Sequence, residues 1–259
     1  MKAFLARALP PLLSAVVFVA LWHTWTQAFE IPAYLVPGPS EVLREAWENR
    51  ADLLPASLVT LAGAVAGFLL SLAVGLAMAL VFAQARWIRA SLYPYAIFLQ
   101  TVPIVAVAPL IVLWCGAGFA SIVLVSFVLS IFPILSNAVL GLTRIHPELE
   151  ELFALHDASR FQTLFKLRLP HCVPSVVAGA KVSAGLTVIG AIVGEFFAGY
   201  GAHTPGLGTL ILQANGQMKT GLLFACVGAS TLLGLCVFLA TGLVAHLLLR
   251  RLEEPESRH

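Results

Sequence analysis

Side chains that could perform chemistry are few in this sequence, and they stand apart from one another. The seven histidines and four cysteines show no HxxxH, HExxH or CxxC spacing, the patterns by which metal sites are often recognised. The phosphate-binding pattern GxxxxGKS/T is absent. We therefore predict no catalytic residue, no metal site and no nucleotide-binding site in this chain, and we expect that it is not an enzyme.

Two features are exceptions. Glu195 lies in the apolar stretch GAIVGEFFAGYG, where a carboxylate is costly and is by default a functional candidate. The alternative is a position at the water interface or a structural partner for this side chain. The second exception is ELFALHDASRFQTLFKLRLP at 151–170, a charged segment between two apolar regions. What either feature can do depends on the elements that hold it.

The composition predicts an integral membrane protein. Hydrophobic residues make up 59% of the 259 residues and charged residues only 11%, whereas a soluble domain carries about 25% charged residues. The apolar runs are continuous and of membrane-crossing length, whereas barrel strands would be short and alternating. We predict an all-α polytopic membrane helix bundle that forms a single domain over 1–259. Its six transmembrane helices are expected at about 8–27, 56–83, 91–114, 119–142, 173–199 and 221–249.

The distribution of Lys and Arg predicts the orientation of the chain. If both termini lie inside, most basic residues outside the spans fall on the inner side. Those left on the outer side are Arg44, Arg50 and Lys219. Both termini and the segment at about 146–170 are therefore expected in the cytoplasm. The segment 28–55 is expected outside, where Ser40 would cap a short amphipathic helix.

Small residues recur every four positions in two of the spans. This spacing gives a smooth face that a second helix can approach closely. The glycines of this pattern are Gly63, Gly67, Gly75, Gly190 and Gly194. Packing within the bundle and packing against another subunit are both open.

Prolines and polar residues in the third and fourth spans indicate where the bundle could bend. Pro103, Pro109 and Pro133 each remove a backbone hydrogen bond from their helix. Kinked helices with polar neighbours suit a bundle that opens around a path, and they suit a static bundle equally. The candidate residues of a substrate path are Gln100, Thr101, Ser130, Asn137 and Glu195.

The charged segment predicts two short helices. Pro147 fits the first turn of a helix, and apolar residues then recur with the period of one helical face. Ser159 followed by Gln162 matches a capping box, so we expect a bend at 157–159. The second helix is expected to run to Leu169 and to stop at Pro170. Either the membrane and bundle or a cytoplasmic partner could cover the apolar face.

This segment resembles the signature loop of ABC importer permeases, which reads Glu-Ala-Ala, three residues, Gly, nine residues and Ile-x-Leu-Pro. Glu151, Leu169 and Pro170 match the motif, and Asp157 stands at the Gly position. Asp is among the few residues that tolerate the positive φ for which Gly is favoured. LVPGPSEVL, VAPLIVLWCGAG and FPILSNAVLGL resemble the nitrate, sulfonate and taurine branch, which includes pyrimidine-precursor and riboflavin importers.

The resemblance implies a type I ABC importer permease fold and a division of labour between subunits. The expected partners are a cytoplasmic ABC ATPase dimer that binds ATP and Mg, a second permease copy forming a homodimer, a periplasmic or lipid-anchored binding protein, and membrane lipid. No nucleic acid and no cofactor of the chain's own are expected. The implied location is the bacterial inner membrane. The implied ATPase-coupling residues are Glu151, Leu152, Leu155, Asp157, Ala158, Ser159, Arg160, Phe161, Leu169 and Pro170.

The charged residues of the spans bear on the substrate and on one alternative function. The spans hold no basic residue beyond Lys181, which favours a neutral or heterocyclic nutrient over an anion such as nitrate or a sulfonate. The third and fourth spans resemble those of the pyrimidine-precursor and flavin importers, and this resemblance implies a pyrimidine precursor or flavin rather than nitrate, taurine or another sulfonate. The alternative to an ABC permease is an ATP-independent secondary transporter or channel. That class predicts inverted repeats and paired intramembrane carboxylates, and the sequence shows neither.

Overall fold

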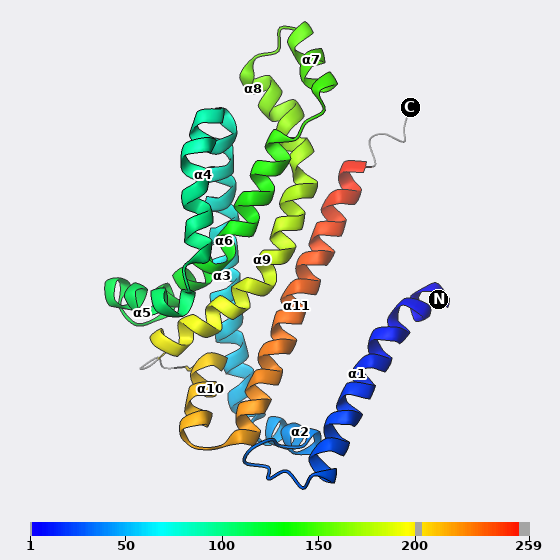
Figure 1. The fold of residues 1–259 in the computed structure, drawn as a ribbon, viewed down its shortest axis with the longest axis vertical. Coiled ribbons are helices and arrows are strands. Elements are labelled where there is room, and N and C mark those ends of the chain that lie inside the picture. The colour runs from blue at the N-terminus through cyan, green and yellow to red at the C-terminus, as the bar shows by residue number, and fades with distance from the viewer. Residues whose placement is uncertain (1, 200–203, 254–259) are drawn as a thin grey trace.

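The computed structural model describes residues 2–199 and 204–253, and within these ranges every regular element is a helix (Figure 1). Four segments are apolar and long enough to cross a membrane: Arg50–Gln84, Phe119–Thr143, Arg160–Ala198 and Thr220–Arg250. The helices are α1 Lys2–Ala28, α2 Pro39–Glu48, α3 Arg50–Gln84, α4 Arg86–Thr101, α5 Ile104–Cys115, α6 Phe119–Thr143, α7 Pro147–Leu155, α8 Arg160–Thr163, a π-helical turn Leu164–Arg168, α9 Leu169–Ala198, α10 Leu207–Gly216 and α11 Thr220–Glu253. The all-helical membrane architecture predicted from composition is confirmed.

Helix α6 packs between α3 and α9 and forms the centre of the bundle. Small residues allow this close packing: a Cβ on Gly67 of α3 would overlap the Ser126 side chain, and a Cβ on Gly190 of α9 would lie 2.6 Å from the Ser126 Cα. Hydroxyl groups also join these helices, because the Oγ atoms of Ser71 and Ser130 lie 2.7 Å apart and Ser183 Oγ donates to the Ser130 carbonyl at 2.6 Å. Such side-chain bonds join neighbouring helices where no water is present.

The two ends of the bundle carry different short helices (Figure 1). α7 and α8 lie at the end towards which the C-terminal part of α11 runs, and α2 and α10 lie at the other. α1 leans away from the bundle, and the ring of Trp22 lies 6.3 Å from that of Phe224 near the start of α11.

The third span, predicted at 91–114 as a helix bent at its prolines, is instead broken into two helices. α4 ends at Thr101, Val102 and Pro103 are extended, and α5 starts at Ile104 in a different direction (Figure 1). Pro103 makes a break possible here, because proline disfavours helical backbone in the residue before it and has no N–H to donate. Pro109 and Pro133, in contrast, lie inside α5 and α6 without ending them.

The predicted N-cap of the short outer helix is also wrong. α2 begins at Pro39, and its N-cap is Gly38 rather than Ser40. Proline is well suited to the first helical position, where its missing N–H would have no partner in any case. The helix therefore starts at the proline, and Ser40 lies one residue inside it.

Candidate functional site

The charged segment folds into an elbow, the name used here for residues 147–168. α7 starts with Pro147 at its first position, and Glu148 and Glu150 lie in its first turn, where the helix dipole favours negative charge. Figure 1 shows the elbow projecting beyond the ends of α4 and α11. The local signals that predict a helix start at Pro147 are therefore confirmed.

The turn of the elbow is a Schellman motif centred on Asp157. Asp157 has a φ of 48°, its N–H donates to the Ala154 carbonyl at 3.1 Å, and the Ala158 N–H donates to the Phe153 carbonyl at 3.0 Å. These two bonds satisfy carbonyls that the end of α7 leaves free. The left-handed residue of this motif is usually Gly. The geometry thus explains why a Gly position of the family pattern can hold Asp.

The second half of the elbow begins with a capping box. Ser159 Oγ accepts from the Gln162 N–H at 3.3 Å, and Gln162 Oε1 accepts from the Ser159 N–H at 2.8 Å. Two otherwise free donors at the start of α8 are satisfied in this way. The predicted capping box and the bend at 157–159 are confirmed.

The expected stop of the second helix at Pro170 is wrong. The chain continues from α8 through the π-helical turn Leu164–Arg168 directly into α9. Pro170 lies in the first turn of α9, and within the π-helical turn the Leu169 N–H bonds to the carbonyl five residues earlier, at Leu164. A π-turn changes the hydrogen-bond register by one residue, so the helix passes through the proline without a break.

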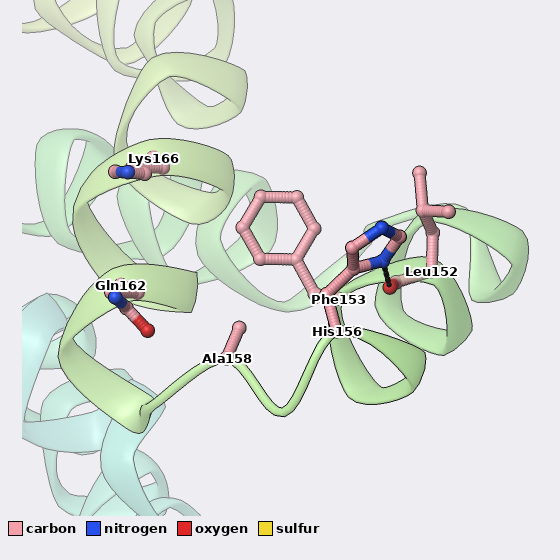
Figure 2. Close-up of a pocket in the computed structure, with 6 residues that line it drawn as sticks. All are labelled: Leu152, Phe153, His156, Ala158, Gln162 and Lys166. Carbon is pink, nitrogen blue, oxygen red and sulfur yellow. Dashed lines mark hydrogen bonds between the residues drawn. The ribbon is translucent and has the colours of Figure 1, made fainter.

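A hollow of about 360 Å³ separates the two arms of the elbow (Figure 2). The ring of Phe153 points from α7 towards the arm that carries Gln162 and Lys166, as Figure 2 shows. His156 Nδ1 donates to the Leu152 carbonyl at 2.9 Å, which holds the imidazole against α7. An ion pair between Arg168 and Glu150 at 3.0 Å ties the π-turn to the start of α7.

The elbow exposes large apolar side chains. Leu155 is 81% exposed, Phe161 is 75% exposed and Phe165 is 62% exposed, and no described part of the chain covers them. Of the predicted coupling residues, Ala158 and Leu169 are half-buried and the others are exposed: Glu151, Leu152, Leu155, Asp157, Ser159, Arg160, Phe161 and Pro170. This end of the molecule therefore presents a mixed apolar and charged surface.

Glu195 lies at the opposite end, in a junction of three helices. It is fully buried, and its Oε2 atom accepts from the Gly208 N–H at 2.7 Å and from Thr60 Oγ1 at 3.1 Å. Thr60 Oγ1 in turn accepts from the Leu207 N–H at 2.9 Å. A Cβ on Gly206 would overlap the carboxyl group. Thr60 and Glu195 thus satisfy first-turn N–H groups of α10 and tie this helix to α3 and α9.

The structure does not gather the five path candidates in one place. Gln100 lines a cavity at the end of α4, and Thr101 beside it donates to its own helix at the Phe98 carbonyl. Ser130 is buried among the hydroxyl groups that join α3, α6 and α9. Asn137 donates to the Pro133 carbonyl at 2.8 Å. Their part in a substrate path stays a prediction.

The five packing glycines all lie at helix contacts within the chain. A Cβ on any of them would come within 3.0 Å of an atom of α6. They are Gly63, Gly67 and Gly75 in α3, and Gly190 and Gly194 in α9.

Thr60 and the carboxylate contact of Gly208 are not among the residues predicted from the sequence. Thr60 is one small polar residue in a long apolar span, and only its position near the outer end could have marked it. Gly208 belongs to a Gly-Leu-Gly stretch, and its two small residues can be recognised in the sequence as a place where the backbone could be approached closely. Neither signal names Glu195 as the partner, because 135 residues separate Thr60 from Glu195.

The comparisons with known proteins all indicate the same family. The family model described as "Binding-protein-dependent transport system inner membrane component" matches residues 71–254. The riboflavin transport system permease protein RibX of Chloroflexus aurantiacus is 35% identical, over 90% of this chain and 87% of its own. The formylaminopyrimidine transport permease protein ThiX of Halalkalibacterium halodurans is 31% identical, over 94% and 96%. An inward-facing structure of the MetNI methionine ABC transporter matches with a TM-score of 0.64 and 16% identity, over 76% of this chain and 96% of that chain.

Proposed function

The chain belongs to the family of binding-protein-dependent transport system inner membrane components, the ABC permeases, and from this premise we propose that it is the membrane subunit of an ABC importer. It shares the fold of a type I importer permease. Its four long apolar helices agree with a subunit that crosses a membrane several times. We place it in a bacterial inner membrane with both termini in the cytoplasm.

The elbow is the main support for the proposal that a separate ATPase drives transport. Leu155 and Phe161 are exposed at the tip of two short, internally capped helices, on the predicted cytoplasmic side. Apolar side chains held rigidly in this way are suited to a groove on a partner protein. ATP and Mg bind to that ATPase dimer and not to this chain, which has no phosphate-binding loop.

The remaining partners follow from the same assignment. A second copy of the chain completes the path, and a periplasmic or lipid-anchored binding protein delivers substrate at the α2 and α10 end. The ATPase dimer changes shape on ATP binding and shifts the permease between two states, since the elbow fits the two shapes differently. The ATP-independent alternative has no support among the relatives or in the six spans predicted from the sequence, where Glu195 is the single acidic residue.

The substrate we propose is a small neutral heterocycle. The relatives named for riboflavin and formylaminopyrimidine transport are 35% and 31% identical, and the permease named for aliphatic sulfonates from Bacillus subtilis is 25% identical. A sulfonate is anionic and would need a cationic partner inside the membrane. A pyrimidine precursor or a flavin is therefore favoured over nitrate, taurine or another sulfonate.

Leu155→Ala tests the proposed contact with the ATPase. The matched control is Leu43→Ala in α2, because Leu43 is 72% exposed in a short helix at the opposite end. The chain would be co-purified with its ABC ATPase, and ATP-dependent uptake would be measured in liposomes. Truncating a central contact costs more than about 1 kcal/mol, so we expect ATPase binding about tenfold weaker for Leu155→Ala and unchanged for Leu43→Ala. Equal binding by both variants would contradict docking at the elbow.

A further inference from the structure

A cavity of about 220 Å³ lies where α4 and α5 are broken apart. Three separate parts of the chain meet there: the break itself, the middle of α6 and the middle of α9. The cavity is lined by Gln100, Val102, Ile104, Val128, Leu129, Phe132, Pro133 and Leu186. The single polar side chain among these is Gln100, and no charged side chain lines the cavity.

The backbone around this cavity has free hydrogen-bonding groups of both kinds. The last carbonyls of α4 and the first N–H groups of α5, at Ile104 and Val105, have no backbone partner within their helices, although the Phe98 carbonyl accepts from Thr101 Oγ1 at 2.8 Å. Pro133 has no N–H, so the Leu129 carbonyl lacks its usual helical donor. Irregular backbone at membrane depth is tolerated where protein or a water-filled cavity satisfies it. The break therefore offers donors and acceptors beside an otherwise apolar wall.

Gln100 adds a polar group to the same place. Its amide has one acceptor oxygen and two N–H donors, and its side chain is exposed in the single chain. A glutamine facing hydrocarbon would be costly, and polar residues in membrane segments normally face the bundle interior or a water-filled cavity. This face of α4 is therefore better explained as the wall of a path than as a surface facing lipid.

We propose that this cavity is a subsite of the translocation path for a neutral, planar, hydrogen-bonding ring, with Gln100 as its specificity-determining residue. The proposal rests on the proposed transport function. The Gln100 amide pairs with the donor and acceptor edge of the ring, and the side chains of Phe132, Val128 and Leu186 contact its faces. An anion such as a sulfonate has no cationic partner here and is disfavoured.

Gln100→Leu tests the subsite in the assembled transporter. Gln27→Leu at the end of α1 is the matched control, because Gln27 is also exposed and lies outside the cavity. The complex with its ATPase and binding protein would be reconstituted in liposomes, with labelled riboflavin, formylaminopyrimidine and taurine as probes. We expect Gln100→Leu to lower uptake of the ring compound about tenfold, because the polar edge of the ring loses its partner. The variant should still co-purify with the ATPase, because Gln100 lies in α4 and outside the elbow.

The outcomes separate this proposal from the proposed function. Uptake of the ring compound at the wild-type rate by Gln100→Leu overturns the subsite and leaves the importer intact. If the wild-type complex takes up taurine but neither riboflavin nor formylaminopyrimidine, the proposed ligand chemistry is wrong. No ATP-dependent uptake of any probe by the wild type contradicts the proposed function first. If Gln100→Leu fails to assemble, Val128→Phe fills the cavity from α6 and should block uptake in a complex that still contains the ATPase. Normal uptake by Val128→Phe also overturns the subsite.

Discussion

The contact between α6 and α9 leads to a prediction that one added methyl group can test. A Cβ placed on Gly190 would lie 2.6 Å from Ser126 Cα and 3.3 Å from the Val125 carbonyl oxygen. Carbon atoms prefer separations of about 3.5–4.0 Å, and the Ser126 Cα is backbone that cannot rotate aside. Gly190→Ala must therefore push the two helices apart locally by about 1 Å.

The size of the effect follows from this displacement and from a control on the same helix. A gap of this size weakens the surrounding contacts, and overpacking of this kind typically costs about 1–3 kcal/mol. It also stretches the bond from Ser126 Oγ to the Thr187 carbonyl, now 2.9 Å. Alanine favours a helix over glycine by about 1 kcal/mol, which offsets part of the loss. Gly185→Ala has the same gain and no clash, because a Cβ on Gly185 would have no atom within 4 Å.

Thermal unfolding of the purified protein in detergent, followed by tryptophan fluorescence, measures the difference. Each kcal/mol corresponds to about 2–4 °C in Tm for a chain of this size. We expect Gly190→Ala to melt several degrees below wild type and Gly185→Ala to melt at or slightly above it. Equal Tm values for the two variants would refute the reasoning, because both share the change in helix propensity and differ in the contact with Ser126.

Substitutions at Asp157 and at Glu195 give two further predictions. Asp157→Gly should leave the elbow as stable as in wild type, whereas Asp157→Ala should weaken it by about 1 kcal/mol, because alanine is strained at positive φ. Hydrogen exchange at the Ala158 N–H reports this difference, and equal exchange in the two variants would argue against the Schellman turn. Glu195→Ala should lower stability by on the order of 3 kcal/mol, since it leaves a cavity and removes the acceptor of the Gly208 N–H. Glu195→Gln keeps the shape and the acceptor and should melt within a few degrees of wild type, so an alanine variant as stable as the glutamine variant contradicts the junction.

The elbow can be predicted from the sequence because its signals are local. Proline at a first helical position acts through its fixed φ and its missing N–H, and a serine three residues before a glutamine acts through hydrogen bonds within one turn. Pro147, Ser159 and Gln162 therefore mark both helix starts correctly. The left-handed turn at Asp157 is accessible through the family pattern, since the same position calls for Gly.

The effects of the other prolines cannot be read from the sequence because they depend on distant packing. Pro103 ends a helix beside a cavity, whereas Pro133 remains inside α6, which α3 and α9 hold in place. The sequence predicts that Pro170 stops a helix, but a π-turn carries the chain through it. In each case the local penalty is similar, and the surrounding helices decide whether the helix breaks.

The same dependence on packing gives α9 a central place in the proposed importer. α8, the π-turn and α9 form one continuous helical segment, Arg160–Ala198, which begins in the elbow and ends just beyond Glu195. Leu167 in the π-turn is buried, and Arg168 pairs with Glu150 of α7, so the turn is fixed to both arms of the elbow. α9 also contacts α3, α5, α6, α10 and α11. A displacement applied to the elbow by an ATPase would therefore reach the cavity wall and the α10 junction through one packed helix, and rigid packed elements of this kind can carry energetic coupling between distant sites.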